Sequence, residues 1–503
     1  LTITPAGFFM ASAEGANLLS VVRGFEPYSV LQFFDHLYRP DLVVETLKGD
    51  PEGNYEDAAS KLNLEKILDS GPAPEIELRK TEKAGDTVRL TLRLVGTGGG
   101  IGRKLIWRVN GLTQGDPTPP ELEGLADDVL ASATVTQTLQ VDPGQTNTVE
   151  VTAYNGAGLL ATPPLRITID AFGVTTEERP RMYVLALGVN TYRMKDYQLR
   201  YAVKDAQEFA EALKVVGSTL FAEVSVMPLL NEQVNEENIA AAFDKIAAEA
   251  KPTDVFVLFV SGHGRSVAGR YYYYPQNLDF ASRQTYQDGI GQDMWQKWLA
   301  KVPAQKTLLI FDTCESGAAG RLIRGTDSVR QTAMDQLQHA TGHNLIAAAG
   351  STKPALEGYK GHGVLTYALL AALTKKEGVA GEEKVKVGTL ADYVDEHVPT
   401  ITQRVWGEYQ KPVRKLSGHD FPIGFKVAAL RRTADEEIPS EPTHVLIRPE
   451  RVRETPATDA PGERQLVPGT QVRVVELVGD WAIIAREGEK MGYVPVEALA
   501  KIQ

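Results

Sequence analysis

Two short apolar segments, residues 255–260 and 308–311, constrain the fold of this chain more than any other feature. Each is an uninterrupted run of large apolar residues, which is typical of a strand buried on both faces of a parallel sheet. Small and polar residues follow both runs, among them His263 and Cys314, the single cysteine of the 503-residue chain. Functional residues of open α/β sheets gather where the strands end. We therefore expect these two residues to meet at one edge of a central sheet.

The sequence around these two segments alternates between strand and helix patterns. Apolar runs at 182–189, 221–227 and 343–349 predict further strands. The intervening segments carry apolar residues at helical spacing, as in the series Leu199, Val203, Ala206, Ala210 and Leu213. Such spacing predicts amphipathic helices. The alternation favours a largely parallel sheet covered by helices on both faces.

The residues around His263 and Cys314 carry a resemblance to a known family. Ser261-Gly262-His263-Gly264 precedes Asp312-Thr313-Cys314-Glu315-Ser316-Gly317 in the chain. Together they resemble the paired motif of caspase-like cysteine peptidases (clan CD), closer to the metacaspase and bacterial caspase-like branch than to animal caspases. The resemblance extends over residues 179–428 and implies a caspase-like α/β sheet that carries a cysteine peptidase site.

The resemblance also implies the roles of individual residues. His263 would take the thiol proton of Cys314, and the thiolate would attack a peptide carbonyl. The backbone N–H groups of Gly264 and Cys314 would form the oxyanion hole. A second histidine, His362, also lies between two glycines. It follows the nucleophile in the chain and lacks the strand-end context, so we do not expect it to be the base. No third catalytic residue is evident.

In metacaspases, the pocket for the residue before the scissile bond is lined by residues that correspond here to Asp205, Ser261 and Asp312. Two carboxylates and a hydroxyl would bind a guanidinium or ammonium group through charge-assisted hydrogen bonds. The resemblance thus implies cleavage after Arg or Lys. The alternative interpretation is structural: Asp205 merely begins a helix and Asp312 ends a strand.

The segment after the nucleophile contains basic residues that an Arg-specific peptidase could cut in its own chain. Arg321 and Arg324 lie in the predicted loop 318–325, and Arg330 follows it. We interpret this segment as a candidate activation loop with candidate autocleavage sites at these three arginines. The alternative is a solvated loop without a regulatory role.

Four further segments flank the predicted peptidase domain. Residues 1–72 show no clear fold pattern, and because the chain begins with Leu rather than Met we expect an upstream region. Residues 73–172 alternate apolar and polar residues between Gly-rich turns, which predicts an immunoglobulin-like β-sandwich. Residues 429–442 have the polar, proline-bearing composition of a linker. Residues 443–503 resemble a bacterial SH3-like β-barrel, with a predicted docking role for a regulatory partner.

Composition limits the remaining function classes. The formal net charge of −12 argues against a general nucleic-acid binder, which usually has a basic surplus. No apolar run approaches the roughly 18 residues that a membrane-spanning helix needs. A single cysteine excludes an intrachain disulfide and suits a reducing, cytoplasmic compartment. The sequence requires no cofactor or metal, and its scattered Asp and Glu residues do not establish calcium dependence.

The sequence therefore predicts a multidomain cysteine endopeptidase whose substrates are proteins or peptides with a basic residue before the cleaved bond. The alternative is a catalytically silent caspase-like scaffold that recruits partners through its β domains. The intact Cys–His pair speaks against this alternative, and covalent reaction of Cys314 with an active-site probe would discriminate between the two.

Overall fold

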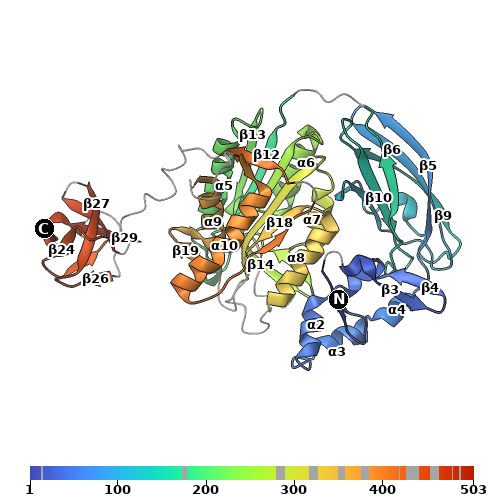
Figure 1. Cartoon of the computed structure of the whole chain (residues 1–503), viewed down its shortest axis with the longest axis horizontal. Helices are drawn as coiled ribbons and strands as arrows, with labels where there is room; N and C mark the ends of the chain where they lie inside the picture. Colours follow the sequence, from blue (N-terminus) through green and yellow to red (C-terminus); the bar gives the residue numbers. More distant parts are fainter. Residues whose placement is uncertain are drawn as a thin grey trace. The chain divides into compact units, whose positions relative to one another are not determined.

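The computed structural model divides the chain into two compact units, Leu1–Lys426 and Val427–Gln503 (Figure 1). The structure describes residues 1–12, 15–172, 178–278, 289–315, 327–348, 357–374, 384–417, 420–425, 441–453, 464–478, 480–486 and 489–502. For a few residues at the ends of elements, including Cys314 and Glu315, only the backbone is described.

A mixed sheet forms the centre of the first unit. Its main strands, in spatial order, are β13 (Val224–Leu230), β12 (Met182–Gly188), β14 (Val255–Val267), β17 (Lys306–Glu315), β18 (Asn344–Ala347) and β22 (Val413–Lys415). The first five are parallel, and β22 runs antiparallel to β18. The predicted largely parallel sheet is thus confirmed, and β22 is an antiparallel strand at one edge of this main series.

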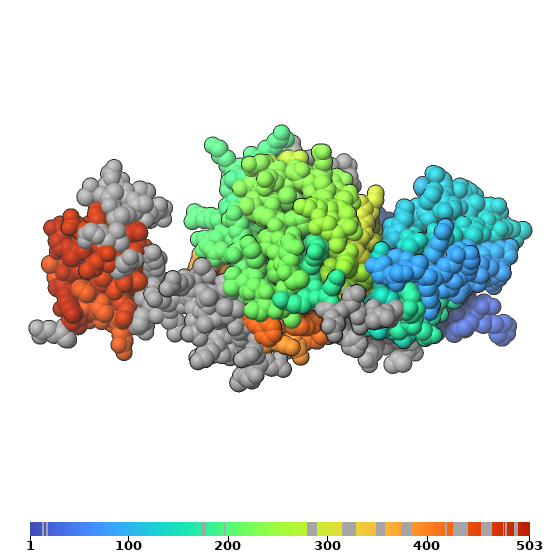
Figure 2. All heavy atoms as spheres, turned by 90° about the horizontal axis from the view of Figure 1, so that it is seen from above, coloured from blue at the N-terminus to red at the C-terminus, as the bar shows by residue number. Residues whose placement is uncertain are grey.

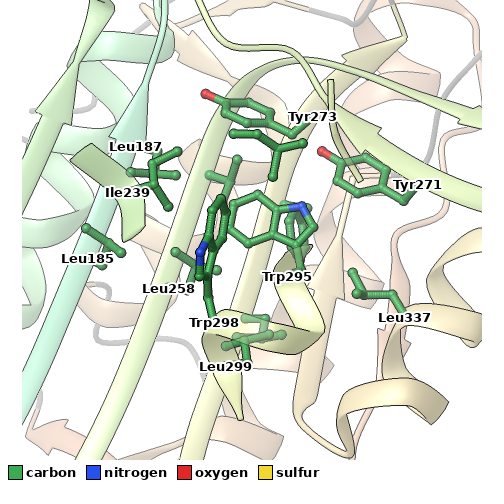
Figure 3. Packing of buried hydrophobic residues seen from close by; sticks show 14 of the residues in the cluster. Leu185, Leu187, Ile239, Leu258, Tyr271, Tyr273, Trp295, Trp298, Leu299 and Leu337 are labelled. Carbon is green, nitrogen blue, oxygen red and sulfur yellow. The ribbon is translucent and has the colours of Figure 1, made fainter. Parts of the chain in front are cut away.

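Helices cover both faces of this sheet. They are α5 (Ala202–Gly217), α6 (Glu236–Glu249), α7 (Gln292–Leu299), α8 (Asp327–Thr341), α9 (Val364–Thr374) and α10 (Val387–Trp406). On one face, Trp295 and Trp298 of α7 pack with Leu258 of β14 in a large apolar cluster that also includes residues of α6 and α8 (Figure 3). On the other face, Phe209 of α5 stacks on Phe259. Successive residues of β14 therefore point into two different cores, as strand geometry requires.

The two central strands are longer than the apolar runs predicted. β14 continues past Val260 through His263 to Val267, and β17 continues to Glu315. Both strands therefore include the polar residues that follow their apolar runs. The extension of β14 pairs with β15 (Arg270–Tyr273), which pairs in turn with β16 (Ile290–Gly291). The apolar run of β14 ends at Val260, and residues 261–267 continue the strand through backbone pairing with β15 and β17.

Residues 75–169 form two antiparallel sheets that share one core. The first contains β5 (Glu75–Ala84), β6 (Thr87–Val95) and β9 (Ser132–Gln140), and the second contains β11 (Leu165–Ile169), β10 (Asn147–Ala153), β7 (Leu105–Val109) and β8 (Leu112–Gln114). Val88, Leu90, Leu92 and Leu94 of β6 are fully buried, in agreement with their alternation in the sequence. The immunoglobulin-like classification of this sandwich stays a prediction.

The N-terminal segment has its own small core and contacts α8, the helix that follows β17 in the chain. Its elements are β1 (Thr2–Ile3), β2 (Phe9–Met10), β3 (Ser20–Arg23), β4 (Glu26–Ser29), α1 (Phe34–Leu37), α2 (Pro40–Leu47), α3 (Asn54–Lys61) and α4 (Leu64–Asp69). Tyr38 donates a hydrogen bond to Asp335 of α8 at 2.7 Å, and Gln336 of α8 donates to the carbonyl oxygen of Tyr38 at 2.9 Å. These contacts anchor α8 to the N-terminal segment.

The second unit consists of short antiparallel strands (red in Figure 2). They are β24 (His444–Leu446), β25 (Glu450–Val452), β26 (Arg464–Leu466), β27 (Gln471–Val478), β28 (Trp481–Arg486), β29 (Glu489–Pro495) and β30 (Leu499–Lys501). The SH3-like classification stays a prediction, and most of the predicted linker lies outside the described residues. None of the helices in the described part of the chain combines the length and apolar character needed to cross a membrane.

Candidate active site

The candidate site lies where β14 and β17 run side by side. Their parallel register pairs His263 with Cys314 and, two residues earlier, Ser261 with Asp312. Neighbouring strands lie about 4.8 Å apart, so the backbone of the two motif residues occupies adjacent positions. The side chain of Cys314 lies outside the described part of the structure. The sheet thus brings the backbone of His263 and Cys314 together as the strand pattern led us to expect.

The imidazole of His263 is oriented by the segment that follows β12. Its Nε2 lies 2.9 Å from the backbone carbonyl oxygen of Tyr197. A carbonyl oxygen only accepts, so Nε2 carries the proton of the neutral ring and Nδ1 is the nitrogen that can accept one. The backbone N–H of His263 donates to the hydroxyl of Tyr192 at 2.7 Å, and the two rings lie 4.7 Å apart. Sequence reasoning missed both tyrosines.

Close packing explains the glycines on either side of His263. Gly262 has a φ of 147°, and a Cβ there would lie 2.7 Å from the hydroxyl oxygen of Tyr192. A Cβ on Gly264 would lie 2.8 Å from the hydroxyl oxygen of Tyr271. Both distances are too short for a carbon–oxygen contact. A side chain at either position would therefore displace a tyrosine that packs beside the histidine strand.

Two buried carboxylates lie near the same sheet edge. Asp205, in the first turn of α5, is 2% exposed, and Asp312 of β17 is 9% exposed. Both approach one glycine: a Cβ on Gly363 would lie 2.8 Å from Oδ2 of Asp312 and 3.2 Å from Oδ2 of Asp205. Ser261, which is also buried, is the register partner of Asp312. The structure thus gathers the three residues of the predicted substrate pocket.

Burial makes ionisation of both carboxylates costly. It raises the pKa of Asp205 to about 7, against a hydrogen bond that the backbone N–H of Gly363 donates at 2.9 Å. Burial also raises the pKa of Asp312 to about 7, and the negative charge of Asp205 adds to this effect. The backbone N–H and hydroxyl of Thr366 both donate to Oδ2 of Asp312 and oppose the rise. Such a pair favours binding of a cation.

His362 is a further member of this region that sequence reasoning did not place there. It lies in β20 (His362–Gly363), which forms a hairpin with β19 (Glu357–Tyr359). Its Nδ1 lies 2.7 Å from Oδ1 of Asp205, and its Nε2 lies 3.4 Å from Oε2 of Glu208. The Gly-His-Gly sequence was the only available signal. Its carboxylate partners lie on α5, with Asp205 157 positions away in the chain.

Of the three candidate autocleavage residues, the structure describes only Arg330. Arg321 and Arg324 lie outside the described residues. Arg330 lies in the first turns of α8 and is 7% exposed. A peptidase binds extended, accessible backbone, so cleavage after Arg330 would require local unfolding of this helix.

The described residues hold no group of three or more His, Cys, Asp or Glu side chains with the arrangement of a metal site. The carboxylates near His362 are instead engaged by protein donors, namely His362 itself, Gly363 and Thr366. The calcium dependence that the sequence left open stays untested.

Comparison with family models defines the class of the central domain. Residues 181–417 match the model described as the caspase domain. This match confirms the resemblance to caspase-like peptidases found in the two sequence motifs. A comparison with curated proteins found no match.

Solved structures similar to this chain include a protein from Geobacter sulfurreducens, with 19% sequence identity and a TM-score of 0.32. That alignment covers 50% of this chain and 96% of the Geobacter chain. The structure of pro-sf-caspase-1 aligns with 15% identity and a TM-score of 0.29, and the alignment covers 48% of this chain and 92% of that one.

Proposed function

We propose that this protein is a cysteine endopeptidase that uses His263 as base and Cys314 as nucleophile. The observation that carries the proposal is the register of β14 and β17, which pairs these residues at the edge of a caspase-family sheet. A cysteine nucleophile needs a neighbouring base that can accept the thiol proton. The hydrogen bond from Nε2 to Tyr197 leaves Nδ1 as the proton-accepting nitrogen of the neutral ring, which supports this role for His263.

In the proposed reaction, His263 takes the proton of the Cys314 thiol and the thiolate attacks the scissile carbonyl carbon. The C–N bond then breaks, and the imidazolium gives its proton to the departing amine. Water attacks the resulting thioester while His263 accepts one of its protons, and the proton then passes to the released thiolate. Backbone N–H groups of Gly264 and Cys314 would stabilise the oxyanion in both steps. The carbonyl of Tyr197 would orient the ring and stabilise its charged form.

The proposed specificity is cleavage after Arg or Lys. Asp205 and Asp312 are buried carboxylates beside Ser261, and a cationic side chain would offset the cost of their ionisation. An acidic side chain would add a third negative charge to the same buried region. The charge of this region therefore supports a basic residue and disfavours aspartate before the scissile bond.

Fluorogenic peptides that differ only in the residue before the cleaved bond test this proposal. We expect the purified full chain to cleave the Arg and Lys peptides and to leave the Asp peptide intact. Cys314→Ala should abolish turnover, while its circular dichroism spectrum and melting temperature stay those of the wild-type chain. Turnover by a folded Cys314→Ala variant would contradict the assignment of the nucleophile, and faster cleavage after Asp would contradict the pocket.

The caspase-domain match does not favour the alternative of a catalytically silent scaffold. A covalent peptide probe for cysteine peptidases separates the two functions. We expect it to label Cys314 in the wild-type chain and to leave the His263→Ala variant unlabelled. A chain that binds partners through its β domains but never reacts with the probe would support the scaffold.

Autocleavage in the segment after the nucleophile is a further part of the proposal. Intact mass spectrometry of the wild-type chain and of Cys314→Ala after equal incubation tests it. Fragments that end at Arg321 or Arg324, and that form only in the wild-type chain, are the expected result. An unchanged wild-type mass would remove autocleavage from the proposal.

A further inference from the structure

His362 lies against the proposed substrate pocket without belonging to the proposed catalytic pair. It is 5% exposed, and carboxylate oxygens face both of its ring nitrogens, Oδ1 of Asp205 at 2.7 Å and Oε2 of Glu208 at 3.4 Å. An imidazole with both nitrogens protonated donates to two acceptors, whereas the neutral ring donates to one. This environment therefore favours the positively charged form of the ring.

The two pocket carboxylates differ in how fully the protein engages them. Asp205 uses both of its oxygens, because Oδ1 faces His362 and Oδ2 accepts from the backbone N–H of Gly363 at 2.9 Å. Asp312 accepts only at Oδ2, where both donors come from Thr366. Within the described residues, Oδ1 of Asp312 is left for a further donor. The pocket thus contains one carboxylate that the fold occupies and one that it leaves open.

We propose that His362 is a positioning residue of this pocket: it holds and neutralises Asp205, so that Asp312 is the carboxylate that binds the cationic side chain of the substrate. The inference rests on the proposed function and deepens it by assigning separate roles to the two carboxylates. It also gives the Gly361-His362-Gly363 sequence a role that the dyad does not require.

Two lysines are further positively charged groups near His362 in the described part of the chain. Lys204 lies one turn before Glu208 on α5, with its Nζ 3.7 Å from Oε1 of that carboxylate. Lys360, in the turn before β20, lies over the rings of Tyr359 and Tyr367. Against the rise in pKa that burial causes, the charge of Lys204 lowers the pKa of Asp205, and the charge of His362 lowers the pKa of Asp312. Contact geometry therefore distinguishes the two carboxylates: protein donors reach both oxygens of Asp205, whereas the described donors to Asp312 reach only its Oδ2.

Removal of His362 has a consequence that depends on pH. Burial already raises the pKa of both Asp205 and Asp312 to about 7. Without the positive donor beside Asp205, both carboxylates would hold their protons to higher pH. Binding of an arginine side chain requires ionised carboxylates in the pocket. As pH rises, KM for an arginine peptide would therefore fall at a higher pH in a chain without His362 than in the wild-type chain.

The test is the pH dependence of KM and kcat for the full chain with paired substrates. The two peptides differ only in carrying arginine or citrulline, its neutral analogue, before the cleaved bond. For His362→Ala we expect KM for the arginine peptide to rise about tenfold at pH 7, as the loss of a charge-assisted hydrogen bond implies. We expect kcat to stay within about twofold, since the dyad is untouched, and the KM difference to shrink by pH 8.5. The citrulline peptide should show little change.

Two further variants make the result specific. His362→Asn keeps a neutral donor near Oδ1 of Asp205, so we expect it to recover part of the lost affinity. His397→Ala removes a histidine of α10 that stacks on Tyr393, outside the pocket, and should behave as wild type. Melting temperatures of all variants distinguish loss of the pocket from loss of the fold.

The outcomes separate the inference from the function on which it rests. If the wild-type chain and His397→Ala cleave no arginine peptide, the proposed function fails and the inference fails with it. If they cleave it and folded His362→Ala has the wild-type KM profile at every pH, only the inference is overturned. A KM rise that is equal at all pH values and equal for both peptides would assign His362 a purely structural role.

Discussion

Two regions of the segment that matches the caspase domain contain the same tripeptide, Gly-His-Gly, in different surroundings. Gly262-His263-Gly264 lies in the extended β14, where the imidazole contacts a backbone carbonyl and a tyrosine ring. Gly361-His362-Gly363 lies at the β19–β20 hairpin, where the imidazole contacts two carboxylates. The local sequence is identical, and the partners supplied by the rest of the fold differ.

The difference in partners indicates a difference in function. A neutral acceptor at Nε2 orients the ring of His263 without fixing a charge on it, so the ring can gain and lose a proton during a reaction. Carboxylate oxygens face both ring nitrogens of His362, which suits compensation of pocket charge more than proton transfer. Identical tripeptides thus serve as candidate base and candidate counter-ion.

The largest expected effect comes from His263→Ala. Loss of the base should lower kcat by at least about 10²–10⁴-fold, the range of general acid–base catalysis. His362→Ala is the matched control, since it removes the other histidine of the pair and should leave kcat within about twofold. Steady-state assays with the arginine peptide measure kcat of both variants. Equal losses of kcat in the two variants would contradict the assignment of different roles to His263 and His362.

A smaller but clear effect is expected from Gly363→Ala. The added Cβ would lie 2.8 Å from Oδ2 of Asp312 and 3.2 Å from Oδ2 of Asp205, so at least one carboxylate must move. We expect a free-energy cost of about 1–3 kcal/mol from overpacking and a raised KM for the arginine peptide. Gly291→Ala is the control, because its Cβ would approach only the ring of the half-buried Tyr272, at 3.2 Å.

The two carboxylates also predict how stability varies with pH. Their pKa is raised in the folded chain from the ordinary 3.8 to about 7, so the folded state binds more protons than the unfolded state between these values. Their stabilising contribution is fully present below pH 3.8 and is lost as pH rises through about 7.

We therefore expect Asp312→Asn to melt about 2–4 °C above the wild-type chain at pH 8, which corresponds to ~1 kcal/mol, and to lose this advantage at pH 5. Asp293→Asn, at a side chain that is 78% exposed, is the control. Calorimetric melting curves at the two pH values measure the difference. A wild-type chain more stable than Asp312→Asn at pH 8 would contradict the buried-pair description.

Features with a local pattern could be predicted from the sequence. Continuous apolar runs identified the central strands, and the helical spacing from Leu199 to Leu213 identified α5. Asn is a residue type favoured at helix N-caps, and the side chain of Asn235 accepts from the backbone N–H of Asn238 at 2.9 Å. The placement of Asp205 near Asp312 came from the family resemblance, because no local pattern joins residues so far apart in the chain.

The missed features depend on tertiary contacts. The carbonyl oxygen that orients His263 belongs to the backbone of Tyr197, and every residue type has such an oxygen. The strands extend past their apolar runs because β15 pairs with the last residues of β14, a contact that leaves no apolar signature. His362 was set aside because its position after the nucleophile was visible, whereas its contact with α5 was not.

The smallest expected effect comes from Lys204, an exposed charge that can be compared with the buried His362. Its ammonium lies 3.7 Å from Glu208, its side chain is 45% exposed, and water and salt screen such a pair to about 0–1 kcal/mol. Lys204→Ala should therefore change KM for the arginine peptide by less than about twofold at physiological salt. Measurement at low and high salt, beside His362→Ala, gives the contrast between exposed and buried compensation. A KM rise as large as that of His362→Ala would mean that the charge balance of the pocket depends on the whole face of α5 rather than on the buried histidine.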